Sequence, residues 1–175
     1  KKNFFPGGGN NEIAIMKRQA LKDNLYGQHR LFIAYVVSLT DEEFLKSFHG
    51  KWTAGQQLSH ILLSIKPLML VLRLPNFMLK MFFGLSNRPS RSYTGLVHKY
   101  LGKLQNGGRA TGRFVPNAIS VDQKGKLIRS LEKAVKKLSA QIDQFTEDEL
   151  DLLILPHPLL GKLTLREMIY FTIYH

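Results

Sequence analysis

The 175-residue sequence contains no cysteine. This absence excludes disulfides and zinc sites built from thiolates, so any metal site must use His, Asp or Glu side chains. A chain without cysteine is also compatible with the reducing cytosol. We therefore expect a cytoplasmic protein.

The sequence also lacks a long, uninterrupted apolar run. Its most apolar segment, residues 74–91, is broken by Pro75, Lys80, Gly84 and Pro89, whereas a membrane span needs about 20 consecutive apolar residues. We expect no transmembrane segment and predict an inserted helix and loop that cover the core. The alternative is a dimer or lipid surface, because large exposed apolar patches usually mark contacts.

The N-terminal residues lack the apolar stretch of a secretory signal and contain the run FPGGGNN instead. Glycine and asparagine at this density favour an irregular chain. We predict a flexible leader over residues 1–11. Residues 12–175 are expected to form one domain, because chains of this length usually build one core.

Acidic residues are scarce: 13 Asp and Glu stand against 25 Lys and Arg, a formal net charge of +12. Such an excess suits nucleic acid, anionic lipid or an anionic substrate, and it also promotes solubility. Within residues 120–145 the basic side chains lie opposite an apolar stripe and no aromatic residues interleave them. The basic side chains, Lys126, Arg129, Lys133 and Lys136, are therefore predicted to form a solvated face. Nucleic-acid binding is not expected there.

Four segments have apolar residues every three or four positions, which is typical of amphipathic helices. They are residues 12–39, 53–72, 120–145 and a last segment from Thr164. No strand pattern is evident, so we predict an all-α four-helix bundle. Residues 74–119 form an insertion between the second and third bundle helices, with a short helix at 92–104 and a loop at 105–119.

Local chemistry supports three of the predicted helix starts. The pairs Thr53/Gln56, Ser120/Gln123 and Thr164/Glu167 have the spacing of capping boxes. Pro67 predicts a kink or an early stop in the second helix. The last predicted helix is only about 18 Å long and has no terminating Gly or Pro before His175, so we expect it to continue further.

The histidines are the main candidates for chemistry, because neutral imidazole binds divalent metals and bundles build such sites on facing helices. His60 lies in the second helix and His175 in the last, while His29 lies beside the inner stripe of the first. His60 falls away from the centre of its apolar stripe, so a surface or internally hydrogen-bonded role is the alternative. His49, His98 and His157 are predicted to be loop or surface residues. No nucleophile elbow, Ser-His-Asp group or carboxylate pair is evident.

Two segments carry a family resemblance. Lys51–His60 (KWTAGQQLSH) resembles the start of the second helix in DinB-like proteins, where a similar pattern ends in a metal-binding histidine. His157–His175 resembles the family's second signature, which enters the last helix and delivers one histidine, followed by another four residues later. The resemblance implies an up-down-down-up bundle with a divalent metal, often nickel or zinc, held by three histidines at one mouth.

This resemblance assigns His60 as the first metal ligand and His175 as the second, and the third has no counterpart in the sequence. Characterised relatives include thiol-dependent S-transferases and isomerases that use bacterial low-molecular-weight thiols, and others are described as metal-dependent hydrolases. We therefore hypothesise a metal-dependent transferase or hydrolase acting on a small molecule or thiol. Four basic residues are expected to attract an anionic substrate; they are Arg88, Arg91, Arg109 and Arg113. No residue is assigned as general base.

The alternative hypothesis is a non-catalytic helical bundle, acting as a binding or stress-associated module. Such a module would form a homodimer through the insertion at residues 74–119.

Overall fold

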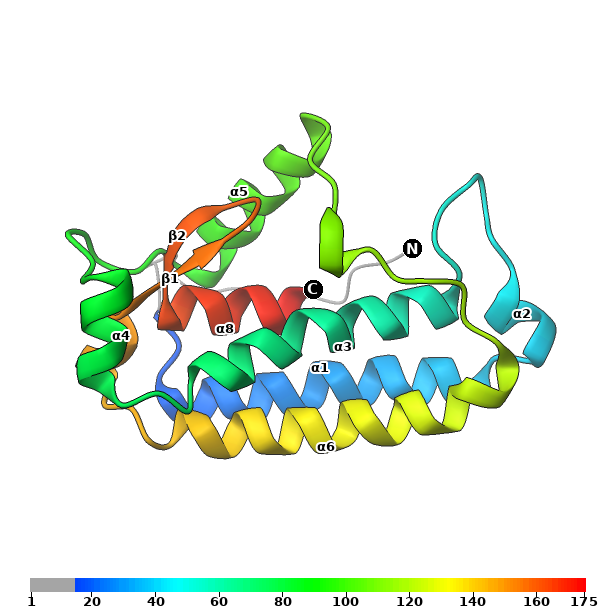
Figure 1. Cartoon of the computed structure of the whole chain (residues 1–175), viewed down its shortest axis with the longest axis horizontal. Coiled ribbons are helices and arrows are strands. Elements are labelled where there is room, and N and C mark those ends of the chain that lie inside the picture. The colour runs from blue at the N-terminus through cyan, green and yellow to red at the C-terminus, as the bar shows by residue number, and fades with distance from the viewer. Residues whose placement is uncertain (1–14) are drawn as a thin grey trace, which may run out of the picture.

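The computed structural model describes residues 15–175, so the predicted leader at residues 1–11 lies outside the described part. Four helices form the bundle (Figure 1): α1 (Arg18–Ser38), α3 (Ala54–Val71), α6 (Lys124–Ile142) and α8 (Leu165–Tyr174). Figure 1 shows α1 and α8 running in one direction and α3 and α6 in the other. The predicted all-α bundle with up-down-down-up order is therefore confirmed.

Short elements connect and cover these four helices. The chain turns from α1 to α3 through α2 (Asp41–Leu45) and from α6 to α8 through α7 (Glu147–Leu152). The insertion between α3 and α6 contains α4 (Asn76–Phe83), α5 (Tyr93–Gln105) and the 3₁₀ turn η1 (Gly112–Phe114), and a second 3₁₀ turn, η2 (Val121–Gln123), directly precedes α6.

Capping boxes start several of these helices. In α3 the Thr53 hydroxyl accepts from the Gln56 amide and the Gln56 side chain accepts from the Thr53 amide. Thr164 and Glu167 make the same exchange at α8. Each such cap contributes about 1 kcal/mol to helix stability. The predicted starts of α3 and α8 are confirmed.

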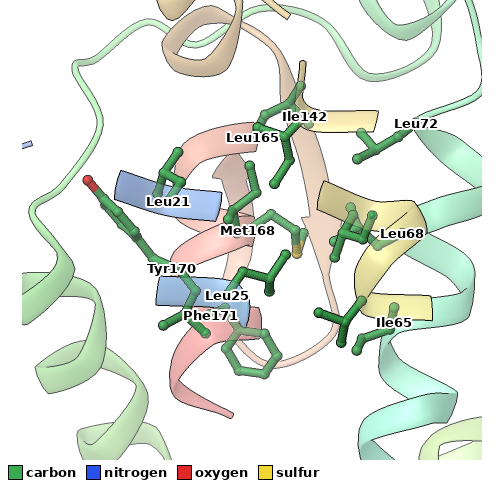
Figure 2. Close-up of a cluster of buried hydrophobic side chains, with 14 of the residues drawn as sticks. Leu21, Leu25, Ile65, Leu68, Leu72, Ile142, Leu165, Met168, Tyr170 and Phe171 are labelled. Atoms are coloured by element: carbon green, nitrogen blue, oxygen red, sulfur yellow. The ribbon is translucent and has the colours of Figure 1, made fainter. Parts of the chain in front are cut away.

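The core forms where α8 meets α1, α3 and α6, and Figure 2 shows this cluster. Leu21 and Leu25 of α1 and Leu68 of α3 surround Met168, and all four side chains are buried. Every residue of α8 from Leu165 to Ile173 is buried, as expected for a helix at the centre of a domain.

Two predicted helix boundaries were wrong. Residues 15–17 are not helical and α1 begins at Arg18; residues 12–14 lie outside the described part. The third bundle helix is an η2 turn followed by α6, which ends at Ile142 rather than at residue 145. An early stop at Pro67 did not occur, because α3 continues to Val71.

A β-hairpin, which was not predicted from the sequence, precedes α8. Strand β1 (Ile154–His157) pairs antiparallel with β2 (Gly161–Thr164). The turn needs Gly161, whose φ is 76°, a conformation that glycine adopts without strain. Sequence patterns missed the hairpin because four-residue strands give few alternations and Pro156 argues against a strand.

The insertion both covers the core and exposes apolar side chains. Leu79 of α4 is fully buried, but Phe77, Met81 and Phe82 of the same helix are exposed to 67%, 66% and 57%. The helix α5 begins beside the predicted position, with Ser92 as its cap. Within residues 15–175, no helix taken alone has the length and apolar composition that crossing a membrane requires. Only α3 and α4 taken together reach that length and composition, and the chain bends by 109° between them.

The basic face of α6 is exposed, as the sequence predicts for a solvated face. Lys126, Arg129, Lys133 and Lys136 are all exposed, and the opposite face buries Leu131, Ala134, Val135, Leu138 and Ile142 in the core. The expectation that nucleic acid does not bind stays a prediction.

Candidate metal-binding site

His60 and His175 meet at one wall of a cavity. His60 lies in the second turn of α3, and the capping box at Thr53 and Gln56 fixes where that helix starts. His175 is the C-cap residue of α8. The Nε2 atoms of the two rings lie 2.9 Å apart. The structure thus brings together the two histidines singled out by sequence.

The orientation of the His60 ring is set by the backbone of the insertion. Its Nδ1 donates a hydrogen bond to the carbonyl oxygen of Phe114, at 2.6 Å. A carbonyl only accepts, so the proton of the neutral ring is on Nδ1 and Nε2 carries a lone pair. Such a carbonyl contact is the usual outer support of a metal-binding histidine. Trp52 packs against the other side of the ring, with centroids 4.7 Å apart.

The ring of His175 is held by aromatic side chains. It stacks on Phe171 of the preceding turn, with centroids 4.7 Å apart and planes 24° apart, and Tyr100 of α5 approaches it edge-on. Burial, and to a smaller extent the charge of neighbouring histidines, lowers the pKa of His175 to about 3. Burial also lowers the pKa of His60, against the effect of the Phe114 carbonyl. Both rings are therefore neutral at pH 7, the form that binds a metal.

The spacing of the two Nε2 atoms is compatible with a shared metal ion. Two nitrogens each about 2.05 Å from one ion lie about 2.9 Å apart at an angle of about 90°, and about 3.3 Å apart at the tetrahedral angle. The observed 2.9 Å matches the first case, and it is equally the length of a hydrogen bond from Nε2 of a neutral His175 to the Nε2 lone pair of His60. Among residues 15–175, however, no group of three or more His, Cys, Asp or Glu side chains is placed to hold a metal. The described residues therefore bring together two candidate ligands.

The cavity beside this pair has a volume of about 1320 Å³. It lies between α3 and α8 and is bounded by α5, by the hairpin turn and by the segment leading into η1. His60, His175 and His157 contribute to its wall, together with Arg109 and Arg113. None of the described residues that line it is Asp or Glu. The wall therefore carries positive charge without a compensating carboxylate.

His157 was predicted to be a loop or surface residue, and this prediction was wrong. It lies at the end of β1, packs edge-on against Phe171 and lines the cavity. Its Nδ1 accepts from the backbone amides of Leu159 and Leu160, each at 3.1 Å. Burial, with a contribution from the charge of Lys99, lowers the pKa of His157 to about 4. Sequence reasoning missed this residue because it missed the hairpin.

The four arginines expected to attract a substrate have two different roles. Arg88 binds both carboxylate oxygens of Glu167 at 2.7 Å, and Arg91 binds the same carboxylate through its amide and its guanidinium. Glu167 is fully buried in α8, so these two arginines neutralise a core carboxylate. Only Arg109 and Arg113 line the cavity.

The remaining histidines of the described chain do not line the cavity beside His60 and His175. His29 is buried in α1, where its Nδ1 contacts the Leu25 carbonyl oxygen at 2.8 Å. His49 and His98 are exposed, His49 in the turn before α3 and His98 on α5.

Comparison with protein-family models supports the resemblance carried by the two signature segments. The family model of the DinB superfamily matches residues 24–175, a range that includes both signature segments, all of α3, α6 and α8, and most of α1. No curated protein and no solved structure matched. From this match and the bundle geometry, the chain belongs to the DinB superfamily.

Proposed function

We propose that the protein is a divalent-metal-dependent enzyme, a hydrolase or a thiol-dependent S-transferase, whose metal is held by Nε2 of His60 and of His175. The observation that carries the proposal is the 2.9 Å approach of these two atoms from helices far apart in the sequence. Nickel and zinc are the preferred ions, since both bind neutral imidazole well. The third ligand would come from outside residues 15–175.

Several features of the chain support this use of the pair. The Phe114 carbonyl orients His60 with its Nε2 lone pair toward His175, and burial keeps both imidazoles neutral. The pair opens on a cavity whose volume exceeds the roughly 300–1,000 Å³ of most small-molecule sites. When bound, a divalent metal supplies a Lewis acid that polarises a substrate oxygen or stabilises a thiolate.

The side chains around the cavity would then bind and orient the substrate. Arg109 and Arg113 attract an anionic small molecule or a low-molecular-weight thiol, since the described wall has no carboxylate to oppose them. His157 presents a neutral ring whose proton is on Nε2, because Nδ1 accepts from two amides. It would donate to a substrate oxygen. No residue is assigned as general base.

Metal analysis of the purified protein tests the proposal. After treatment with chelator and reconstitution, we expect about one nickel or zinc ion per chain, measured by mass spectrometry of the metal and by titration calorimetry. His60→Ala and His175→Ala should each lose at least tenfold in affinity. His98→Ala, an exposed histidine on α5, is the matched control and should bind as the parent does. A parent that binds no metal, or a His60→Ala variant that binds as tightly, would contradict the proposal.

A second candidate, a non-catalytic module that pairs with a second copy of the chain, is favoured by one observation. Phe77, Met81 and Phe82 of α4 expose more than half of their surface, and monomeric proteins rarely expose large contiguous apolar patches. Light scattering across a range of protein concentrations tests it. The paired state should dissociate in a Phe77→Ser/Met81→Ser variant and persist in Leu31→Ser, which changes an equally exposed residue of α1. A parent that is monomeric at every concentration would rule it out.

A further inference from the structure

The cavity follows α3 for much of that helix. Its wall takes residues from α3 at intervals of three or four, beginning at Gln57 and ending at Val71. At a rise of 1.5 Å per residue this stretch is about 21 Å long. The opposite wall is α8, where His175 faces His60 and Met168 lies farther along the cavity, in the same apolar cluster as Ile65 and Leu68 (Figure 2).

The two ends of this long cavity differ in polarity. One end holds His60 and His175, with Lys51, Arg109 and Arg113 exposed around it. The other end is lined by apolar side chains of α3, α4, β1 and α8. These are Leu68, Val71, Phe83, Leu155 and Met168.

Polar groups are few in the apolar half and are already paired. Thr172 donates its hydroxyl to the Met168 carbonyl, and Ser64 donates to the His60 carbonyl. A polar ligand group placed beyond Ser64 would lose its water without gaining a partner, which costs free energy. An apolar chain placed there gains free energy with each methylene that it removes from water.

We infer that the cavity binds an amphipathic anion: a medium- or long-chain alkyl compound with a carboxylate or similar anionic head. The head lies near Arg109, Arg113 and the histidine pair, and the chain extends along α3 toward Val71 and Phe83. The inference names a substrate class for the proposed metal site and in that respect rests on the proposed function. The apolar half itself does not depend on a metal.

Binding of a chain-length series to the metal-free protein tests the inference. The probes are n-alkyl carboxylates of about 4 to about 14 carbons, kept below micelle formation, with 1-alkanols and alkyl phosphates of matched length. The dissociation constant should fall about fourfold per added methylene until the cavity is full, and alkanols should bind more weakly at each length. The phosphate series identifies the preferred anionic head.

Variants of the two ends make the test specific. Val71→Phe should shorten the longest chain that still gains affinity, and Phe83→Ala should lengthen it. Leu70→Phe is the matched control for Val71, because Leu70 is the preceding residue of α3, is exposed and does not line the cavity. Arg113→Gln should reduce the preference for carboxylate over alkanol and leave the gain per methylene unchanged.

Failure of this inference can be told apart from failure of the proposed function. An affinity that does not depend on chain length would overturn the inference, even if the protein binds metal. So would equal effects of Val71→Phe and Leu70→Phe together with no effect of Phe83→Ala. A full chain-length dependence in a protein that binds no metal would uphold it and remove only the metal-dependent function.

Discussion

The Nε2 atoms of His60 and His175 lie 2.9 Å apart although 115 positions separate these residues in the sequence. Each position is determined by local structure: a capping box starts α3 shortly before His60, and the hairpin β1–β2 leads directly into α8, which ends at His175. The meeting of the two rings then depends on the packing of α8 inside the bundle. Changes in that packing are therefore expected to affect the site even where they do not touch it.

The stability of the metal-free protein is expected to fall as the pH is lowered below neutrality. Burial and Lys99 lower the pKa of His157 from 6.5 to about 4, so below pH 6.5 the unfolded chain takes up a proton that the folded chain does not. Between pH 6.5 and pH 5 this difference costs about 1.5 kcal/mol for His157. The loss levels off below about pH 4, where both states are protonated at this residue.

Urea unfolding at several pH values, with chelator present, measures this effect. His157→Gln should reduce the slope between pH 6.5 and pH 5, and the part that remains comes from the other buried histidines, such as His60 and His175. The matched variant His98→Gln changes an exposed histidine and should keep the slope of the parent. Equal slopes in the parent and in His157→Gln would show that His157 is not held neutral in the folded state.

The buried carboxylate of Glu167 is expected to be essential for the stability of α8. Burial raises the pKa of Glu167, but the bonds from Arg88 and from the amides of Arg91 and Thr164 outweigh it, so the pKa lies below its usual range. Glu167→Gln leaves these donors without a charged partner. We expect the free energy of unfolding to fall by roughly 2–3 kcal/mol. Breaking a fully buried ion pair costs about 3–5 kcal/mol, and the loss is smaller here because Arg88 and Arg91 are about one-third exposed.

Chemical denaturation measures that loss, and Glu132→Gln on the exposed face of α6 provides the control, with an expected change within about 0.5 kcal/mol. Because the same contacts lower the pKa of Glu167, its contribution to the free energy of unfolding depends on pH. This contribution begins to be lost as the pH falls below 4.5, the ordinary pKa of a glutamate. A Glu167→Gln variant as stable as the parent would mean that the arginines find other partners.

Two glycine-to-alanine substitutions are expected to have opposite effects. A Cβ at Gly55, in the first turn of α3, would lie 2.8 Å from Phe44 and 3.2 Å from Ile119, whereas a Cβ at Gly27 of α1 would meet nothing within 4 Å. Gly27→Ala should therefore stabilise the protein by about 0.5–1 kcal/mol through helix propensity. Gly55→Ala should destabilise it by about 1–3 kcal/mol through overpacking.

Thermal and urea unfolding of both variants test this pair. Because α3 carries His60, the shift of α3 in Gly55→Ala should also weaken metal binding, whereas Gly27→Ala should leave it unchanged. Stabilisation by both substitutions would show that Phe44 and Ile119 give way without cost.

Prediction from sequence succeeded where the responsible contacts lie within a few residues. The capping pairs at Thr53 and Thr164 identified the starts of α3 and α8, and apolar periodicity identified the four bundle helices. The predicted basic face of α6 is exposed for the same reason. The cytoplasmic location inferred from the lack of cysteine stays a prediction.

Prediction from sequence failed where the outcome depends on distant contacts. Arg88 and Arg91 were expected at the substrate, yet they bind Glu167 more than 70 positions away. The two cannot be separated from Arg109 and Arg113 by composition or spacing, because all four lie in the same basic insertion. His157 was misplaced because short strands are stabilised mainly by their pairing partner.

By itself the sequence determined the helical architecture, because helix periodicity and caps are local properties of the chain. Its two signature segments indicated the family and, through that resemblance, His60 and His175. The tertiary structure alone decided that His60 and His175 converge, that His157 lines the same cavity and that the cavity is basic at one end and apolar at the other. These properties depend on which faces of α3, α8 and the insertion meet, and that choice is made by the packing of the whole core.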